Sequence, residues 1–193
     1  MMGVGTFRYR GTMPTTPPDP VLQEMRDEHA LRKLVHGYCR AVDRGDNEAL
    51  RGMYHPDAVD GHGAFSTGSV DDFLGRLAAS RKHLRSMQHH ITTVNFAIDG
   101  DRAEGEIYSI ATHTFAAKHG ETEVIVGGRY LDKYQKRDGT WRFLERTIVT
   151  DWAHVHDPSS VDLGHPMVRD SLKGSLGPDD PSFALFSLLG GRV

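Results

Sequence analysis

The sequence predicts an α+β fold in which three N-terminal helices pack against one cone-shaped, curved antiparallel sheet. Between residues 21 and 85, apolar residues recur at the three- and four-residue steps of amphipathic helices. From residue 89 onward, apolar and polar residues alternate, and Gly-containing turns divide this region into four long segments. Strands of this length must curl, and a curled sheet closed by helices leaves a deep apolar cavity, the usual kind of small-molecule site.

The helical region begins after a proline-rich stretch. Four prolines between residues 11 and 20 resist helix formation, so we expect residues 1–20 to be a flexible N-terminal arm. The first helix is predicted over residues 21–42, and Gly45 is placed to end it.

Two shorter helices follow, each preceded by a capping residue. Asp46 caps a helix over residues 47–54, and Ser69 caps a helix from residue 70 to about residue 85. The stretch between them, residues 58–65, is predicted as an irregular strand.

A meander of four strands makes up the second half of the predicted domain. Turns at residues 99–101, 118–120 and 138–139 separate strands at 89–98, 102–117, 122–136 and 140–154. Residues 156–193 then form a C-terminal tail with an apolar patch at 183–189, which is too short to span a membrane. We expect this tail to cap the cone or to contact another subunit, because an exposed apolar patch usually marks a contact surface.

Composition excludes several classes of function. The 193 residues are 38% hydrophobic and 25% charged, typical of a soluble globular protein with one domain. A net charge of −3 without clustered Lys and Arg argues against nucleic-acid binding. The chain has no signal-peptide core and no apolar run long enough for a bilayer, and its single cysteine, Cys39, cannot form an internal disulfide. We therefore expect a cytoplasmic protein without membrane or nucleic-acid partners.

Asp43, near the end of the first helix, and the pair His89-His90, at the start of the sheet, are the candidate catalytic residues. A carboxylate can fix the tautomer of an imidazole, and an imidazole that titrates near neutrality can remove a proton at working pH. If the fold brings these groups together in an apolar pocket, they form an acid/base dyad that needs no cofactor. Otherwise, Asp43 is an ordinary solvated residue at a helix end.

A hairpin near the end of the predicted sheet resembles a known family. Residues 127–143, GGRYLDKYQKRDGTWRF, are similar to the last hairpin of SnoaL-like proteins in the nuclear transport factor 2-like superfamily. Residues 38–43, 54–58 and 89–101 fall in the order in which that family places them, so the resemblance covers roughly residues 22–155. It implies a SnoaL-like domain over residues 21–155 with the nuclear transport factor 2-like, cystatin-like α+β barrel.

The resemblance also implies a chemistry, although this fold alone does not determine function. The superfamily includes scytalone dehydratase, bile acid 7α-dehydratase, a hexachlorocyclohexane dehydrochlorinase, ketosteroid isomerases and polyketide cyclases, together with many members without known activity. In its dehydratase and dehydrochlorinase branch, an Asp late in the first long helix pairs with a His that opens the strand after the third helix. Asp43 and the His89-His90 pair match those places. Oligomers are common in this family, so we expect a homodimer or homotrimer.

The choice between the two histidines depends on the register of the strand. Alternation places His90 on the face of the apolar Val94, whereas the family pattern, counted back from residues 99–101, favours His89. One β-bulge would reconcile the two arguments. We predict His89 as the general base, oriented by Asp43, with His90 as the second candidate.

Five further residues are candidates for the pocket. Tyr38, five residues before Asp43, resembles the bile acid dehydratase pattern and could donate a hydrogen bond to a leaving hydroxyl or a carbonyl, or could simply fill the core. Arg146 could stabilise a developing anion or could point outward. His55, in a helix-ending His-Pro-Asp turn, could reach the pocket rim, and Tyr108 and His113 could line the cavity or face solvent.

No cofactor or metal is predicted. The twelve histidines are mostly single, without the His-x-x-x-His or His-Glu-x-x-His spacing of zinc sites, and His154-Val155-His156 is the closest approach. A phosphate-binding glycine loop is also missing, because Gly127-Gly128 lies inside a predicted strand, where it permits bending.

Two functions follow as hypotheses. The first is a cofactor-independent lyase of the dehydratase type, or an isomerase, that acts on a hydrophobic steroid-like or polyketide-like molecule through the Asp-His dyad. The second is a non-catalytic binding protein or accessory subunit with the same fold, which needs the cavity but no contact between Asp43 and a histidine.

Overall fold

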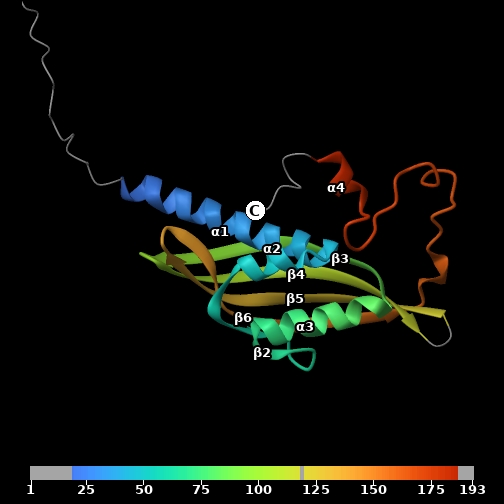
Figure 1. The fold of residues 1–193 in the computed structure, drawn as a ribbon, viewed down its shortest axis with the longest axis horizontal. Helices are drawn as coiled ribbons and strands as arrows, with labels where there is room; N and C mark the ends of the chain where they lie inside the picture. The colour runs from blue at the N-terminus through green and yellow to red at the C-terminus, as the bar shows by residue number, and fades with distance from the viewer. Residues whose placement is uncertain (1–18, 118–119, 187–193) are drawn as a thin grey trace, which may run out of the picture.

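The computed structural model describes residues 19–117 and 120–186, which form a curved sheet covered by helices (Figure 1). Most of the predicted N-terminal arm, the tip of the 118–120 turn and the end of the 183–189 patch lie outside these residues. Within the described ranges, no helix is both long and apolar enough to cross a membrane.

Three helices precede the meander, as predicted. Helix α1 spans Pro20–Arg44, and Gly45 ends it in the left-handed conformation, with φ of 74°. Helices α2, Asn47–Gly52, and α3, Val70–Ser80, are shorter than predicted, and a 3₁₀ turn, Arg81–His83, follows α3. Both helices are shorter because Tyr54 and Leu84, which fall inside the predicted helices, are instead the buried first residues of strands β1 and β3.

The sheet has six strands in the order β2-β1-β6-β5-β4-β3. The predicted meander forms its larger part, with β3 at Leu84–Asp99, β4 at Arg102–Ala117, β5 at Gly120–Arg137 and β6 at Thr140–His156. The meander strands pair antiparallel as predicted, and the whole sheet is mixed, because β1, Tyr54–Gly61, pairs in parallel with β6 and carries the short antiparallel strand β2, Thr67–Ser69.

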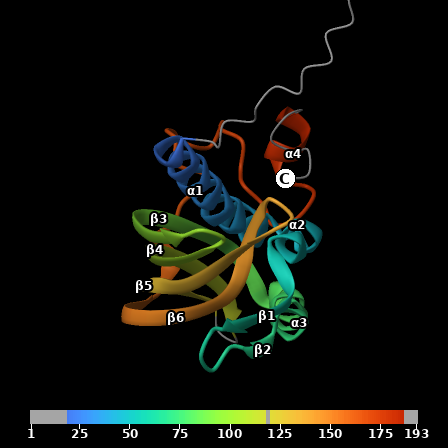
Figure 2. The same cartoon turned by 90° about the vertical axis from the view of Figure 1, so that its left-hand side faces the viewer.

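The sheet curls without closing into a barrel, and the helices cover its inner face (Figure 2). Helix α1 packs on β3 and β6, while α3 lies beside β1 and β2. The buried core between these layers includes Leu31 and Val35 of α1, Ile107 of β4 and Phe143 of β6. Large apolar side chains from both layers thus fix how α1 lies across the sheet.

The C-terminal tail folds back against α1. Its short helix α4, Pro181–Leu185, places the Phe183 ring 5.3 Å from the guanidinium of Arg40. Asp180, which caps α4, forms an ion pair with Arg44 at 3.5 Å. The described part of the tail therefore contacts the outside of the last turns of α1 and contributes no residue to the inner cavity.

Candidate active site

An apolar cavity of about 340 Å³ lies between the inner face of the sheet and helices α1 and α3. Most of its wall is hydrophobic, with side chains from α1, α3 and all four long strands: Val42, Phe73, Leu77, Met87, Ala111, Phe115, Val124, Val126 and Ile148. A few polar side chains interrupt this wall: Tyr38, His62, Ser80, His89, Ser109 and His113. A concave apolar site with a few converging polar groups is typical of small-molecule binding.

Asp43 and His89 meet at this cavity. Asp43 lies in the last turn of α1, and its Oδ1 accepts a hydrogen bond of 2.6 Å from Nδ1 of His89 on β3. Its Oδ2 accepts a second one, of 3.0 Å, from the backbone N–H of His89. Both side chains are only 8% exposed. Because a carboxylate accepts from Nδ1–H, the neutral ring carries its free electron pair on Nε2, the atom that can take a proton from a ligand.

His90 points away from the cavity and is exposed. The ladder of β3 and β4 slips between Ile91 and Val94, where two residues of β3 oppose one of β4, so β3 contains a bulge at this point. The bulge switches the inward face of the strand. His89 therefore shares the inner face with Val94, although strict alternation would have placed His90 there.

Tyr38 lies on the floor of the cavity, one turn before Asp43. Its ring is buried and packs edge-on against Tyr130 and Phe143. Burial raises the pKa of Tyr38 well above its usual value of 10, and the neighbouring Tyr130 adds to the shift. The phenol thus stays protonated at any working pH, and its O–H can donate a hydrogen bond to a ligand.

A second Asp-His pair, which the sequence analysis missed, also faces the cavity. Nδ1 of His62 contacts Oδ1 of the fully buried Asp60 on β1, and Oδ2 of Asp60 accepts a 2.8 Å hydrogen bond from the Tyr54 hydroxyl. The remaining nitrogen of His62, Nε2, lies 3.4 Å from the Tyr38 oxygen. A signal for this pair exists in the sequence, because residues two apart on a strand share one face.

His113 on β4 lines the cavity beside His89, with ring centroids 5.4 Å apart. Burial lowers the pKa of His113 to about 4, and the charge that His89 can carry contributes to the shift. His113 is therefore neutral at neutral pH and provides a polar contact without a charge.

Arg146 lies in the core and does not line the cavity. Its Nε and Nη2 each donate a 2.7 Å hydrogen bond to Asp132, and its guanidinium lies about 4 Å from the ring centres of Tyr38, Tyr130 and Phe143. The sequence analysis offered two alternatives for Arg146, a group that stabilises an anion in the pocket and an outward-facing side chain. The buried position of Arg146 in the core agrees with neither. An inward Arg on a strand is stable here because Asp132 on the neighbouring strand neutralises it.

Two other candidates also lie away from the cavity. His55 is buried on β1, where its Nε2 donates to the Gln135 carbonyl oxygen at 2.8 Å and so connects β1 to β5. Tyr108 is exposed on the outer face of the sheet, with the Arg129 guanidinium 5.9 Å from its ring centre. Of the four predicted substrate-binding residues, the structure brings His113 alone to the cavity wall.

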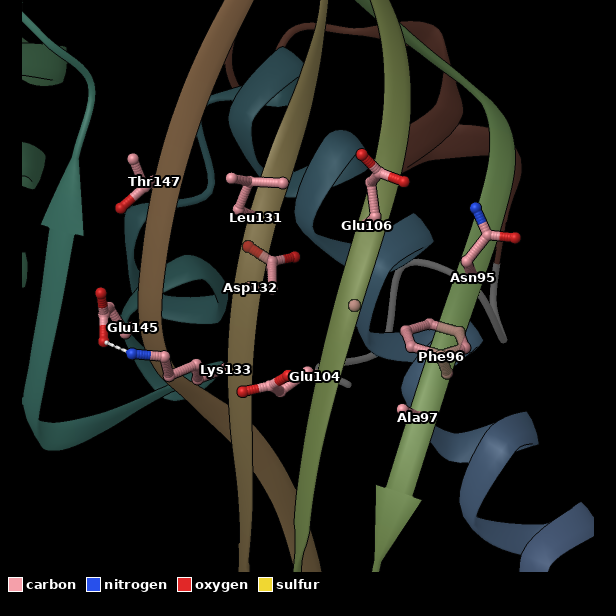
Figure 3. A pocket seen from close by; sticks show the side chains of 11 residues that line it. Asn95, Phe96, Ala97, Glu104, Glu106, Leu131, Asp132, Lys133, Glu145 and Thr147 are labelled. Atoms are coloured by element: carbon pink, nitrogen blue, oxygen red, sulfur yellow. Dashed lines mark hydrogen bonds and ion pairs between the residues drawn. The ribbon is translucent and has the colours of Figure 1, made fainter.

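The outer face of the sheet carries a larger hollow, of about 580 Å³, shown in Figure 3. Charged side chains line it, including Glu104, Glu106 and the ion pair between Lys133 and Glu145 at 2.7 Å. These groups are solvated and already partnered in part, so their charges are screened. We therefore place the candidate site in the smaller inner cavity. In the described ranges, no three His, Cys, Asp or Glu side chains converge as metal ligands do.

Comparison with known proteins gives both a family and a fold. The model of the SnoaL-like domain matches residues 23–147. A solved structure of a proposed scytalone dehydratase from Novosphingobium aromaticivorans is 18% identical with a TM-score of 0.64, and the match covers 71% of this chain and 92% of that one. A hexachlorocyclohexane dehydrochlorinase is 15% identical with a TM-score of 0.67, over 76% of this chain and 98% of that one.

The fold is also similar to that of a subunit of a larger enzyme. The β subunit of a proposed aromatic-ring-hydroxylating dioxygenase from Novosphingobium aromaticivorans is 20% identical with a TM-score of 0.55, over 67% of this chain and 92% of that one. At such identities these structures establish the fold alone, so function has to be argued from the site.

Proposed function

The chain belongs to the SnoaL-like domain family, and from that premise we propose that it is a cofactor-independent lyase of the dehydratase type. Its substrate in this proposal is a hydrophobic alicyclic molecule, steroid-like or polyketide-like, that loses a proton from carbon and a hydroxyl group from the adjacent carbon. An isomerisation that uses the same proton transfer belongs to the same class of activity. The observation that carries the proposal is the 2.6 Å contact between Asp43 and His89, whose side chain lines an apolar cavity.

The reaction starts with His89 as the general base. Asp43 keeps the proton of the neutral ring on Nδ1, so that Nε2 can accept the proton of a substrate C–H group. The imidazolium that forms lies against the Asp43 carboxylate, which stabilises it as the proton moves. Because the cavity wall is largely apolar, this electrostatic stabilisation is stronger than it would be in water.

Tyr38 donates a hydrogen bond to the substrate in this proposal. Its protonated hydroxyl stands at the cavity floor, where it can reach the leaving oxygen or a carbonyl on the same ring. The volume of about 340 Å³ lies within the range of about 300–1,000 Å³ for pockets that bind drug-sized molecules. These features support a compact hydrophobic substrate with few polar groups.

The test is turnover of a two-ring β-hydroxy ketone, β-hydroxydecalone, followed by the ultraviolet absorbance of its enone product. The wild-type protein should form the enone, and His89→Gln should lower kcat/KM by about 10²- to 10⁴-fold, the usual contribution of a general base. The matched change His90→Gln removes the neighbouring exposed imidazole and should leave kcat/KM within about twofold of wild type. Binding without turnover by the wild-type protein would favour the alternative, a carrier or accessory subunit.

Assembly and location belong to the same proposal. A homodimer or homotrimer is supported by the exposed apolar side chains of Ile110 and Trp152 on the outer face, which lie in one row with the buried Gly127 across three strands. Trp152 covers Gly127 so closely that a Cβ there would come within 2.0 Å of the indole. Light scattering on the purified protein would measure the assembly.

A cytoplasmic location is proposed from the single cysteine, Cys39, which is buried and free.

A further inference from the structure

The cavity contains a second carboxylate-imidazole pair that the proposed general base does not use. Asp60 and His62 belong to β1 and the loop after it, whereas Asp43 and His89 belong to α1 and β3. Both histidines line the same cavity. Their ring neighbours differ, because His62 stacks on Phe73 and His89 contacts His113. A molecule in the cavity therefore meets two imidazoles that are each paired with a carboxylate and are supplied by separate elements.

The position of His62 is fixed by several contacts. Its ring stacks on Phe73 of α3 at 4.6 Å with an interplanar angle of 14°. Its backbone N–H donates a 2.6 Å hydrogen bond to the Ser66 carbonyl, which closes the loop after β1. Nδ1 donates to the Asp60 carboxylate, and Tyr54 holds the second oxygen of that carboxylate. These contacts fix the ring plane and occupy Nδ1, so Nε2 is the nitrogen available to a ligand.

Burial and charge are arranged for a proton donor. The Asp60 carboxylate is fully buried and receives hydrogen bonds only from His62 and Tyr54 among the described side chains, and of these two partners His62 is the one that can carry a compensating positive charge. The His62 side chain is 14% exposed and lines the cavity. A pair with a purely structural role would not need the imidazole edge in the cavity.

Nε2 of His62 and the Tyr38 hydroxyl are directed toward one place. Their separation of 3.4 Å is at the long limit for a hydrogen bond, so the direct contact is weak. A ligand oxygen in front of both groups could accept a hydrogen bond from each. Two donors on one oxygen are what a poor leaving group such as hydroxide needs.

We propose that His62, positioned by Asp60, is the general acid that protonates the leaving hydroxyl, with Tyr38 as the second donor to the same oxygen. This inference rests on the proposed lyase function. In the step, Nε2 of His89 takes the proton from carbon, and the electron pair of the C–H bond becomes the new C=C bond. The C–O bond breaks, its oxygen takes the proton from Nε2 of His62, and water leaves. His89 ends protonated and His62 neutral, and proton exchange with solvent restores both.

The test compares two leaving groups on one ring system. β-Hydroxydecalone must expel hydroxide, which needs a proton, whereas β-acetoxydecalone expels acetate, which leaves without one. Both give the same enone, so one absorbance assay serves both. His62→Gln, whose amide can hydrogen-bond but cannot deliver a proton, should lower kcat/KM about 10²- to 10⁴-fold for the hydroxy probe and less than threefold for the acetoxy probe. His89→Gln should impair both probes, because both reactions need the base.

Two more variants complete the test. Asp60→Asn keeps the imidazole and the side-chain volume, and should show the same selective loss on the hydroxy probe. His83→Gln makes the same chemical change at an exposed position and should change neither rate. Equal loss on both probes, or no loss on the hydroxy probe, in a His62→Gln protein that melts like wild type would refute the role of His62 while the lyase function stands. Absence of turnover of both probes by the wild-type protein would refute the function and the inference together.

Discussion

Replacing Asp43 by Asn tests whether the carboxylate acts through the tautomer of His89. Asp43 accepts two hydrogen bonds, from the backbone N–H of His89 at 3.0 Å and from Nδ1–H at 2.6 Å. An Asn side chain has one acceptor oxygen and one NH₂ donor, so it can satisfy only one of these two donors. If its oxygen keeps the backbone N–H, its NH₂ faces Nδ1, which must then become an acceptor. The ring proton moves to Nε2, and the atom that faces the ligand can no longer take a proton.

The expected loss in kcat/KM is that of a general base, about 10²- to 10⁴-fold, or about 2.7–5.5 kcal/mol in activation free energy. Rates on β-hydroxydecalone give this value, and ¹⁵N NMR of the imidazole reports the tautomer directly. Asp99→Asn is the matched control, since it makes the same change at the far end of β3 on a side chain that is 92% exposed. An Asp43→Asn protein with kcat/KM within threefold of wild type, or with Nδ1 still protonated, would refute the reasoning.

Two more predictions concern stability. Asp132→Asn removes the counter-charge of the fully buried Arg146 and should lower the free energy of unfolding by about 3–5 kcal/mol, measured by urea denaturation; a loss below about 1 kcal/mol would contradict the role given to this pair. His113 has a native pKa of about 4, below the value of 6.5 for an exposed histidine, so the unfolded chain binds a proton that the native state excludes between these pH values. The contribution of neutral His113 to the free energy of unfolding is complete above pH 6.5. It is lost as the pH falls toward 4, by at most about 1.4 kcal/mol per pH unit. His113→Gln should therefore make the stability less dependent on pH in this window, and equal slopes for the two proteins would argue against it.

Periodicity in the sequence was sufficient to predict the elements that position the first dyad. The predicted strand 102–117 coincides with β4, and the turn at Gly45 ends α1 as expected. These features depend on neighbours a few residues away, which a sequence displays directly. The placement of Asp43 beside the start of β3 depended instead on the family resemblance, because a helix end and a strand start can lie anywhere relative to each other.

The missed features depend on contacts between distant segments. Pro56 suggested a turn, yet it lies inside β1. The strand tolerates this proline because the pairing of β1 with β6 is interrupted between Tyr54 and Val59, so the sheet needs no backbone N–H from Pro56. Arg146 points inward because Asp132, on the adjacent strand, provides its partner. The sequence does not display either condition. Asp60 and His62 lie two residues apart in the predicted strand at 58–65, but their place beside the cavity depends on the pairing of β1 with β6.

One cavity contains three histidines whose different partners imply different tasks. His113 has no carboxylate partner among the described residues, and burial lowers its pKa to about 4, so it stays neutral. His89 and His62 each contact a buried carboxylate through Nδ1, which leaves Nε2 for proton exchange with a ligand. An elimination needs one group to take a proton and another to give one, at two atoms of the same substrate. Two imidazoles from separate elements, each paired with a carboxylate, meet this requirement. A carrier would need neither carboxylate, because a buried carboxylate charge does nothing to bind an apolar ligand.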